Sequence, residues 1–222
     1  MEKITKYARF IYSKEDEDLI DVLEEALNSQ AEEIFDFFDQ SLSREIVNIK
    51  IIPTKEEYDE ISKKRRKIDV IPKWSIGSYY DNTIEYVSLH DYKNTSHAFV
   101  ESEYEERLDY YKKTIVHEYV HFVTDLYRNK HNLDYPVKWF NEGLATYLSK
   151  QKEGLDISFN CSLDDIMNSN NKYDSWYLLT KYVIEECGKD YFLNILGNNE
   201  LSIKDTPKLY ENAKVFYNIK NR

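Results

Sequence analysis

The chain has 222 residues, of which 41% are hydrophobic and 32% are charged. These fractions exclude a disordered tail and a collagen-like fibre, and the length suits one sizeable domain or two small ones. The formal net charge of −11 argues against nucleic-acid binding, because duplex-binding proteins present a basic surface to the phosphates. We interpret the one basic run, KKRRK at 63–67, as the solvated end of a helix.

Strands and helices share the first half of the chain. Apolar residues at helical spacing predict helices over 16–40 and 55–67. Turn signals around Gly77 fill most of 71–82. Three runs rich in β-branched and aromatic residues predict strands, namely 6–13, 46–52 and 83–89. We expect the third of these strands to form an edge of the sheet.

The second half of the sequence predicts helices without strands. A long helix is expected over 102–129, and Pro136 begins another that runs to about 151. After a loop come a short turn at 163–167 and a helix that starts at the capping residue Asp174 and ends at Gly188. Short helices are expected over the remainder.

Strands mixed with helices and then helices alone are typical of the α+β class, with one small mixed sheet. We expect a single domain over 1–222, with a sheet-containing half at 1–100 and a helical half at 101–222. A cleft between these halves is the natural place for a functional site.

The segment 115–123, IVHEYVHFV, carries the residues that point to chemistry. Apart from His117, Glu118 and His121, every residue in it is apolar or aromatic, so a helix here should be buried on most of its surface. Burying two imidazoles and a carboxylate is costly unless they are paired or bind a metal. A segment that served folding alone would have little reason to hold these three groups.

The spacing of these residues suits a metal site. His117 and His121 are one helical turn apart and project from the same face, about 6 Å apart at the backbone. Their imidazole nitrogens can therefore share one Zn²⁺ at about 2.0–2.1 Å. Glu118 lies about 100° around the helix, where it can approach a metal-bound water as a general base without ligating the metal.

A third zinc ligand is expected within 138–147, KWFNEGLATY. Glu142 follows His121 by 21 positions, which leaves enough chain to lay a second helix beside the first. Packed helices have axes about 8–10 Å apart, a distance over which a carboxylate can reach the metal. Gly143 would permit the two backbones to approach closely.

HEYVH at 117–121 followed by WFNEGLATY at 139–147 resembles the gluzincin metallopeptidases, in particular the small peptidase MA-like and minigluzincin proteins. The stretch HEYVHFVTD is also similar to the active-site helix of thermolysin, and a more distant likeness extends to zinc aminopeptidases. The resemblance implies a zincin-like fold in which Zn²⁺ is bound by His117, His121 and Glu142.

The sequence departs from these relatives in two places. It has no segment of the type with which aminopeptidases capture the amino terminus of a substrate. Thr146 stands where thermolysin-like enzymes carry an orienting carboxylate, so the group that orients His117 must come from another position.

The resemblance also implies a tyrosine that stabilises the oxyanion, at the start of a later helix. Tyr173 matches that position, and Tyr177, one turn on, is the alternative; ordinary packing would explain either tyrosine equally well. The resemblance further implies that the strand at 83–89 lies over the cleft and binds extended peptide by strand addition.

We therefore expect a zinc metallopeptidase, a hydrolase in which Glu118 takes the proton of a zinc-bound water and Tyr173 helps to hold the oxyanion. The alternative is a non-catalytic zinc-binding domain that recognises peptides, although such a domain would not need Glu118. A latent peptidase whose own tail, about 200–222, occupies the cleft is a third interpretation. The expected partner is a peptide or protein substrate, while the oligomeric state stays open.

No run of about 18 apolar residues predicts a membrane span, and the start of the sequence lacks a secretory signal pattern. We expect a cytoplasmic protein without a membrane partner.

Cys161 and Cys187 lack metal-type spacing and are interpreted as reduced structural thiols. The remaining candidates are interpreted as surface or packing residues: His90, His97, Asp125, His131, Trp139 and Phe140.

Overall fold

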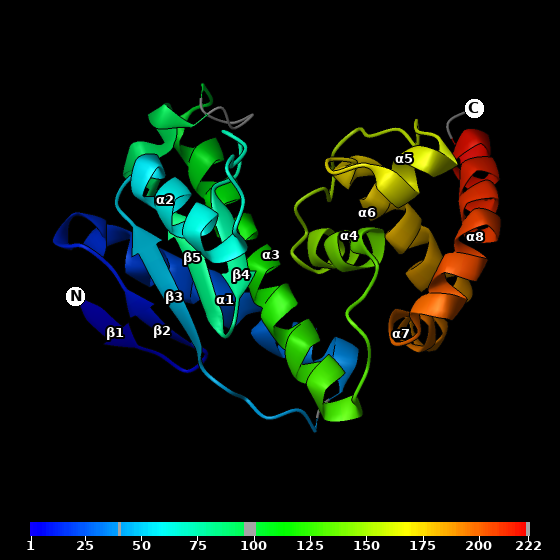
Figure 1. Cartoon of the computed structure of the whole chain (residues 1–222), viewed down its shortest axis with the longest axis horizontal. Helices are drawn as coiled ribbons and strands as arrows, with labels where there is room; N and C mark the ends of the chain where they lie inside the picture. The colour runs from blue at the N-terminus through cyan, green and yellow to red at the C-terminus, as the bar shows by residue number, and fades with distance from the viewer. Residues whose placement is uncertain (40, 96–100, 221–222) are drawn as a thin grey trace. The chain divides into compact units, whose positions relative to one another are not determined.

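Strands precede most of the helices along the chain (Figure 1). In the residues that the structure describes, 1–39, 41–95 and 101–220, five strands form one mixed sheet. Of these described residues, 62% are helical. With its helices and its mixed sheet, this computed structural model has the α+β class that the sequence predicts.

The chain divides into two compact units. The first unit comprises Met1–Ile34 and Ser43–Phe122, and the second comprises Phe35–Leu42 and Val123–Arg222. The first unit contains the sheet, and the second is built from helices.

The sheet has a parallel centre and antiparallel margins. Its strands are β1 (Glu2–Ile4), β2 (Ala8–Ile11), β3 (Val47–Ile52), β4 (Gly77–Tyr80) and β5 (Thr83–Val87). They lie in the order β1-β2-β3-β5-β4. β3 is parallel to both β2 and β5, whereas β1 and β4 are antiparallel to their neighbours. β1 and β4 are therefore the two outer strands.

The prediction of an edge strand at 83–89 is wrong. β5 lies between β3 and β4, and the edge is β4, which occupies part of the segment where the sequence shows turn signals. Asp81 and Asn82 join the two strands with φ angles of 46° and 56°. Two consecutive residues in the left-handed region are typical of a tight type I′ hairpin turn. β1 is likewise a strand that the sequence does not predict.

Three helices belong wholly or partly to the first unit. They are α1 (Glu17–Phe38), α2 (Lys55–Arg66) and α3 (Tyr104–His131), with short 3₁₀ turns at Lys14–Asp16 and Leu89–Asn94. α2 begins after Thr54, whose hydroxyl accepts a hydrogen bond from the Glu57 N–H, and ends at Lys67 in the left-handed conformation. Within the described residues, the three helices agree with the predicted ones to within two residues at each end. Residue 40, the predicted end of the first helix, lies outside those residues.

α3 packs on one face of the sheet through aromatic side chains. The Tyr86 ring on β5 stacks on Tyr111 with centroids 4.3 Å apart, and its hydroxyl donates to the Tyr111 carbonyl oxygen at 3.0 Å. On the other face of β5, Arg65 of α2 forms an ion pair with the buried Glu85. Because both faces of β5 are covered, its polar and apolar residues are buried alike.

The second unit contains α4 (Lys138–Leu148), α5 (Leu163–Asn168), α6 (Tyr173–Tyr182), α7 (Lys189–Leu196) and α8 (Asn199–Lys220). A π-helical turn, Val183–Cys187, extends α6 as far as Gly188. α4 is shorter than the predicted helix 136–151, because it begins after the N-cap residue Val137. The short turn expected at 163–167 is the helix α5.

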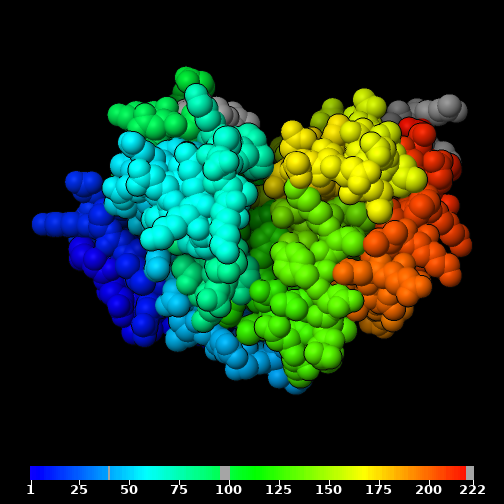
Figure 2. Space-filling model, in the orientation of Figure 1, coloured from blue at the N-terminus to red at the C-terminus, as the bar shows by residue number. Residues whose placement is uncertain are grey.

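α8 departs most from prediction, since one helix of 22 residues replaces the expected short helices. Pro207 lies inside it. The space-filling view shows α8, coloured orange to red, at the surface of the second unit (Figure 2).

None of the helices in the described part of the chain has both the length and the apolar character that crossing a bilayer requires.

Candidate metal site

The HEYVH segment lies in the middle of α3. Every apolar or aromatic residue of 115–123 is buried, as the sequence predicts. His117 and Glu118 are buried too, with exposed fractions of 5% and 8%, and His121 is half-buried. Polar groups at this depth are stable only when they are hydrogen-bonded or bind an ion.

His117 and His121 turn their rings toward each other. Their Nε2 atoms lie 3.2 Å apart, and the ring centroids are 4.9 Å apart at an interplanar angle of 84°. The two nitrogens therefore face one point on the same side of α3, as the one-turn spacing predicts. A neutral imidazole nitrogen that carries no proton can present its lone pair to a cation at that point.

Glu118 lies beside the edge strand. A β-carbon built on Gly77, the first residue of β4, would be 3.4 Å from Glu118 Cγ and 2.8 Å from the Tyr86 ring. A larger residue at position 77 would thus displace Tyr86 and press on Glu118. The sequence does not predict this role for Gly77; the only available signal is that glycine is rare in the chain, with five among 222 residues.

α4 is anchored by the two aromatic residues that precede the candidate ligand Glu142. Trp139 and Phe140 are buried, as expected, and the Trp139 indole N–H donates to Thr206 Oγ1 of α8 at 3.1 Å. Glu142 is half-buried. The Thr146 hydroxyl donates to the Glu142 carbonyl oxygen at 2.7 Å, so Thr146 bonds within its own helix.

Gly143, next to Glu142, faces α6. Trp176 and Thr180 of that helix leave no room for a β-carbon at position 143. We expected Gly143 to permit close approach to the helix that carries His117 and His121, and that expectation is wrong, because the close contact is with α6.

His117, His121 and Glu142 form a group that could hold a metal ion. One ligand atom of each residue, an imidazole nitrogen or a carboxylate oxygen, lies within 4.8 Å of the others. Two imidazoles and a carboxylate suit divalent metals that accept nitrogen and oxygen ligands. No second group of three such ligands occurs in the described part of the chain.

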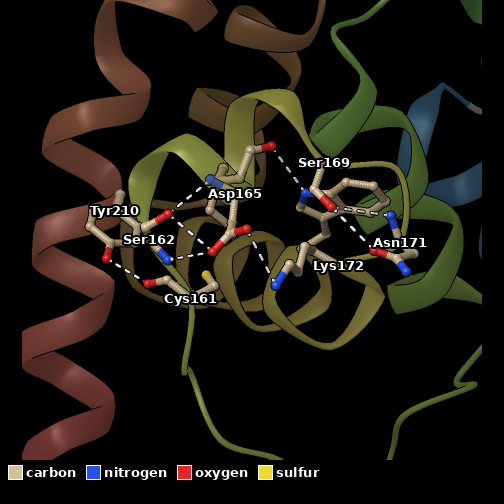
Figure 3. A network of polar contacts seen from close by, with 9 residues as sticks. Cys161, Ser162, Asp165, Ser169, Asn171, Lys172 and Tyr210 are labelled. Atoms are coloured by element: carbon tan, nitrogen blue, oxygen red, sulfur yellow. Dashed lines mark hydrogen bonds and ion pairs between the residues drawn. The ribbon is translucent and has the colours of Figure 1, made fainter.

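Tyr173 is the first residue of α6, and a polar network holds the start of that helix (Figure 3). The Lys172 ammonium lies 3.3 Å from the Asp165 carboxylate of α5. Asp165 also accepts hydrogen bonds from the Ser162 N–H and hydroxyl, at 3.1 and 3.0 Å, and these hold the pKa of its carboxyl below the usual range. The network joins the start of α6, beside Tyr173, to α5.

Tyr177, the alternative oxyanion residue, is buried one turn later. Its ring lies 6.2 Å from that of Tyr147, and burial raises the pKa of its hydroxyl. Tyr173 is half-buried and packs edge-on against Trp176, with centroids 5.3 Å apart. A residue that contacts substrate must be accessible, and of the two Tyr173 is the more exposed.

The other candidates make local contacts. Ion-pair distances of 3.3, 3.6 and 3.5 Å join Asp125 to Arg128, His131 to Asp39, and His90 to Asp18. His97 lies outside the described residues. Both cysteines are free thiols, and burial raises the pKa of each.

No protein-family model, curated protein or solved structure matches the chain. Any functional assignment must therefore come from the residues themselves.

Proposed function

We propose that this chain is a zinc metallopeptidase that hydrolyses peptide bonds. The observation that carries the proposal is the 3.2 Å separation of the His117 and His121 Nε2 atoms, in a group that includes Glu142. Two nitrogen ligands of a tetrahedral zinc, each about 2.0–2.1 Å from the ion, lie about 3.3–3.4 Å apart. The histidine pair therefore already has the separation that one shared ion requires.

The donor set favours a catalytic over a structural zinc. Structural sites are usually closed by four protein ligands that include cysteines, whereas two histidines and a glutamate leave one position open. Neither cysteine of the chain belongs to the group. When bound, zinc supplies a Lewis acid that polarises the scissile carbonyl and lowers the pKa of water.

Glu118 is the general base in this proposal. It takes a proton from the attacking water and passes it to the leaving amine. Glu118 is buried on the same helical segment as the histidines but is not one of the three grouped ligands. A binding module would have no use for a buried carboxylate at that place, and this favours the enzyme over the non-catalytic alternative.

An extended peptide substrate would lie along β4. β4 is an outer strand among the described strands, and its first residue, Gly77, adjoins Glu118. A peptide that adds to this edge by strand pairing would bring a carbonyl group toward Glu118. Tyr173 donates its hydroxyl to the carbonyl oxygen as negative charge develops there.

Metal analysis combined with a peptide-cleavage assay tests the proposal. The purified protein is analysed for bound metal and then incubated with a diverse peptide pool that is read by mass spectrometry. We expect close to one zinc per chain and cleavage that a chelator abolishes. Zinc without cleavage would support the binding module or the latent peptidase over the active enzyme. Absence of any metal affinity would refute the site.

A further inference from the structure

A basic and apolar segment follows α2 in the first unit, and the proposed function makes no use of it. Residues 63–74, KKRRKIDVIPKW, carry six basic side chains and one acidic side chain, in a chain whose net charge is −11. We refer to 63–74 as the basic–apolar segment. Its charge is opposite in sign to that of the whole protein.

Most of these cations face solvent. Arg65 is the exception, since it forms an ion pair with Glu85 and lies over the Tyr80 ring at 5.3 Å. Five others are exposed, and within the described residues no ion pair joins them to an acidic group: Lys63, Lys64, Arg66, Lys67 and Lys73. The prediction of a helix end at 63–67 is confirmed, because α2 ends at Arg66. The cations are nonetheless unusually dense for an acidic protein.

Apolar side chains are exposed among these cations. Val70 is 74% exposed, and Ile68 and Trp74 are each 41% exposed. Ile71 is buried and anchors the loop, while the Ser75 N–H closes a turn by donating to the Pro72 carbonyl oxygen at 2.9 Å. A solvated helix end needs charge, but it does not need an exposed valine, isoleucine and tryptophan close by.

We propose that the basic–apolar segment docks this protein on the surface of an anionic lipid bilayer. Lysine and arginine are attracted to anionic headgroups, while tryptophan and aliphatic side chains insert at the boundary between headgroups and acyl chains. The cyan to turquoise residues of α2 and this segment are visible at the surface of the first unit (Figure 2). Peripheral docking of this kind needs no spanning helix. The proposal therefore departs from the expectation of no membrane partner, which rested on the absence of a membrane span.

Two alternative partners match the segment less well. Duplex nucleic acid would pair with the cations but would leave Val70 and Ile68 in water. An acidic polypeptide would also satisfy the charges without requiring an aliphatic cluster. The negative net charge of the chain opposes docking only weakly, because charges more than about 8 Å away are largely screened at physiological ionic strength.

Vesicle binding by the full chain tests the proposal. The protein is sedimented with phosphatidylcholine vesicles that contain or lack phosphatidylserine, at low and high salt. Trp74 supplies a second readout, because the other two tryptophans, Trp139 and Trp176, are fully buried. We expect binding only to the anionic vesicles, weakened by salt, with a blue shift of the tryptophan emission.

Matched variants localise the effect. The triple variant Lys63→Gln, Lys64→Gln and Arg66→Gln should weaken vesicle binding on the order of 10²-fold, since each charge near an anionic surface contributes about fivefold. Val70→Gln should weaken it about tenfold through lost apolar burial. The control variant removes three exposed lysines of α8 and should bind like wild type: Lys204→Gln, Lys208→Gln and Lys214→Gln.

Three outcomes would overturn the proposal. The first is no binding to anionic vesicles. The second is an equal loss in the control variant, which would show a general charge effect. The third is tight, segment-dependent binding to polyglutamate or RNA without vesicle binding. Because none of these measurements uses peptide cleavage, the proposal stands or falls independently of the peptidase assignment.

Discussion

Gly143 on α4 and Trp176 on α6 are in such close contact that a β-carbon at position 143 would lie 2.8 Å from the Trp176 carbonyl oxygen. The same β-carbon would lie closer still to Thr180 Oγ1. Glu142 precedes this glycine, so the contact between the two helices also fixes the position of a candidate metal ligand.

The first prediction is that Gly143→Ala destabilises the protein. Overpacking costs about 1–3 kcal/mol, and the gain from replacing a helical glycine by alanine, about 1 kcal/mol, offsets only part of it. We expect a net loss of about 1–2 kcal/mol in the free energy of unfolding, measured by urea titration. Adding Thr180→Ala removes one obstructing atom and should restore part of the loss. An unchanged unfolding midpoint would show that the two helices are not so close.

The second prediction concerns metal and stability. A metal that binds only the folded protein stabilises it by about 2.7 kcal/mol when its free concentration is 100 times its Kd. We expect the melting temperature to fall by roughly 5–10 °C on chelation and to recover with zinc. A variant with both His117→Ala and His121→Ala should not respond to zinc. Identical melting of metal-free and zinc-treated wild type would contradict the site.

The third prediction identifies the third ligand. Glu142→Ala removes one of three protein ligands and should weaken zinc binding by more than about 100-fold, beyond the effect typical of outer-shell residues. His131→Ala is the control, because His131 lies beside Asp39, 3.6 Å away, and is not in the ligand group. Zinc affinity is measured by competition with a fluorescent chelator. Equal affinities for the two variants would exclude Glu142.

The fourth prediction separates proton transfer from metal binding. Glu118→Gln preserves side-chain size and leaves both histidines intact, so zinc content and melting temperature should not change. The amide cannot accept a proton from water at neutral pH, and turnover should fall by about 10²–10⁴-fold or more. All three quantities are measured on the same preparation. A fully metallated Glu118→Gln protein with wild-type turnover would defeat the mechanism.

The fifth prediction distinguishes the two tyrosines. Tyr173→Phe should lower turnover by about 10–10³-fold with little effect on unfolding, because it removes one hydrogen-bond donor to the developing oxyanion. Tyr177→Phe should leave turnover within about twofold, since Tyr177 is buried beside Tyr147. The reverse result would assign the role to Tyr177.

The metal group could be predicted from sequence because one helix fixes most of its geometry. His117 and His121 differ by one turn, so any α-helix over 115–123 brings their imidazoles together. The contribution of Gly77 could not be predicted, because it depends on how the edge strand packs against α3. Such a contact between distant segments leaves no local pattern in the sequence.

The sequence does not predict β4, because this strand also depends on contacts that leave no local pattern. Its four residues begin with glycine, which has low strand propensity, and pairing with β5 makes them a strand. Without β4, the strand at 83–89 is left at the edge of the predicted sheet. The predicted edge position of β5 is therefore wrong for the same reason.

α8 shows that tertiary packing can override a local breaker. Pro207 lacks an N–H and its ring crowds the preceding turn, which predicts an interruption. The helix nevertheless continues, and Leu209, Tyr210 and Ala213 just beyond the proline are buried. Burial of that face stabilises a helix that the isolated sequence would not favour.

The parallel setting of β3 has a consequence for the order of folding. The β1–β2 and β4–β5 hairpins are local in sequence and can form within microseconds. β3 pairs with β2 and β5 through residues such as Phe10, Ile49 and Ile84, which lie roughly 35–40 positions apart. The entropy of closing these long loops is lost before the pairing is complete, so it slows this step. Until β3 is in place, the two hairpins have no common partner, and the sheet as a whole cannot form.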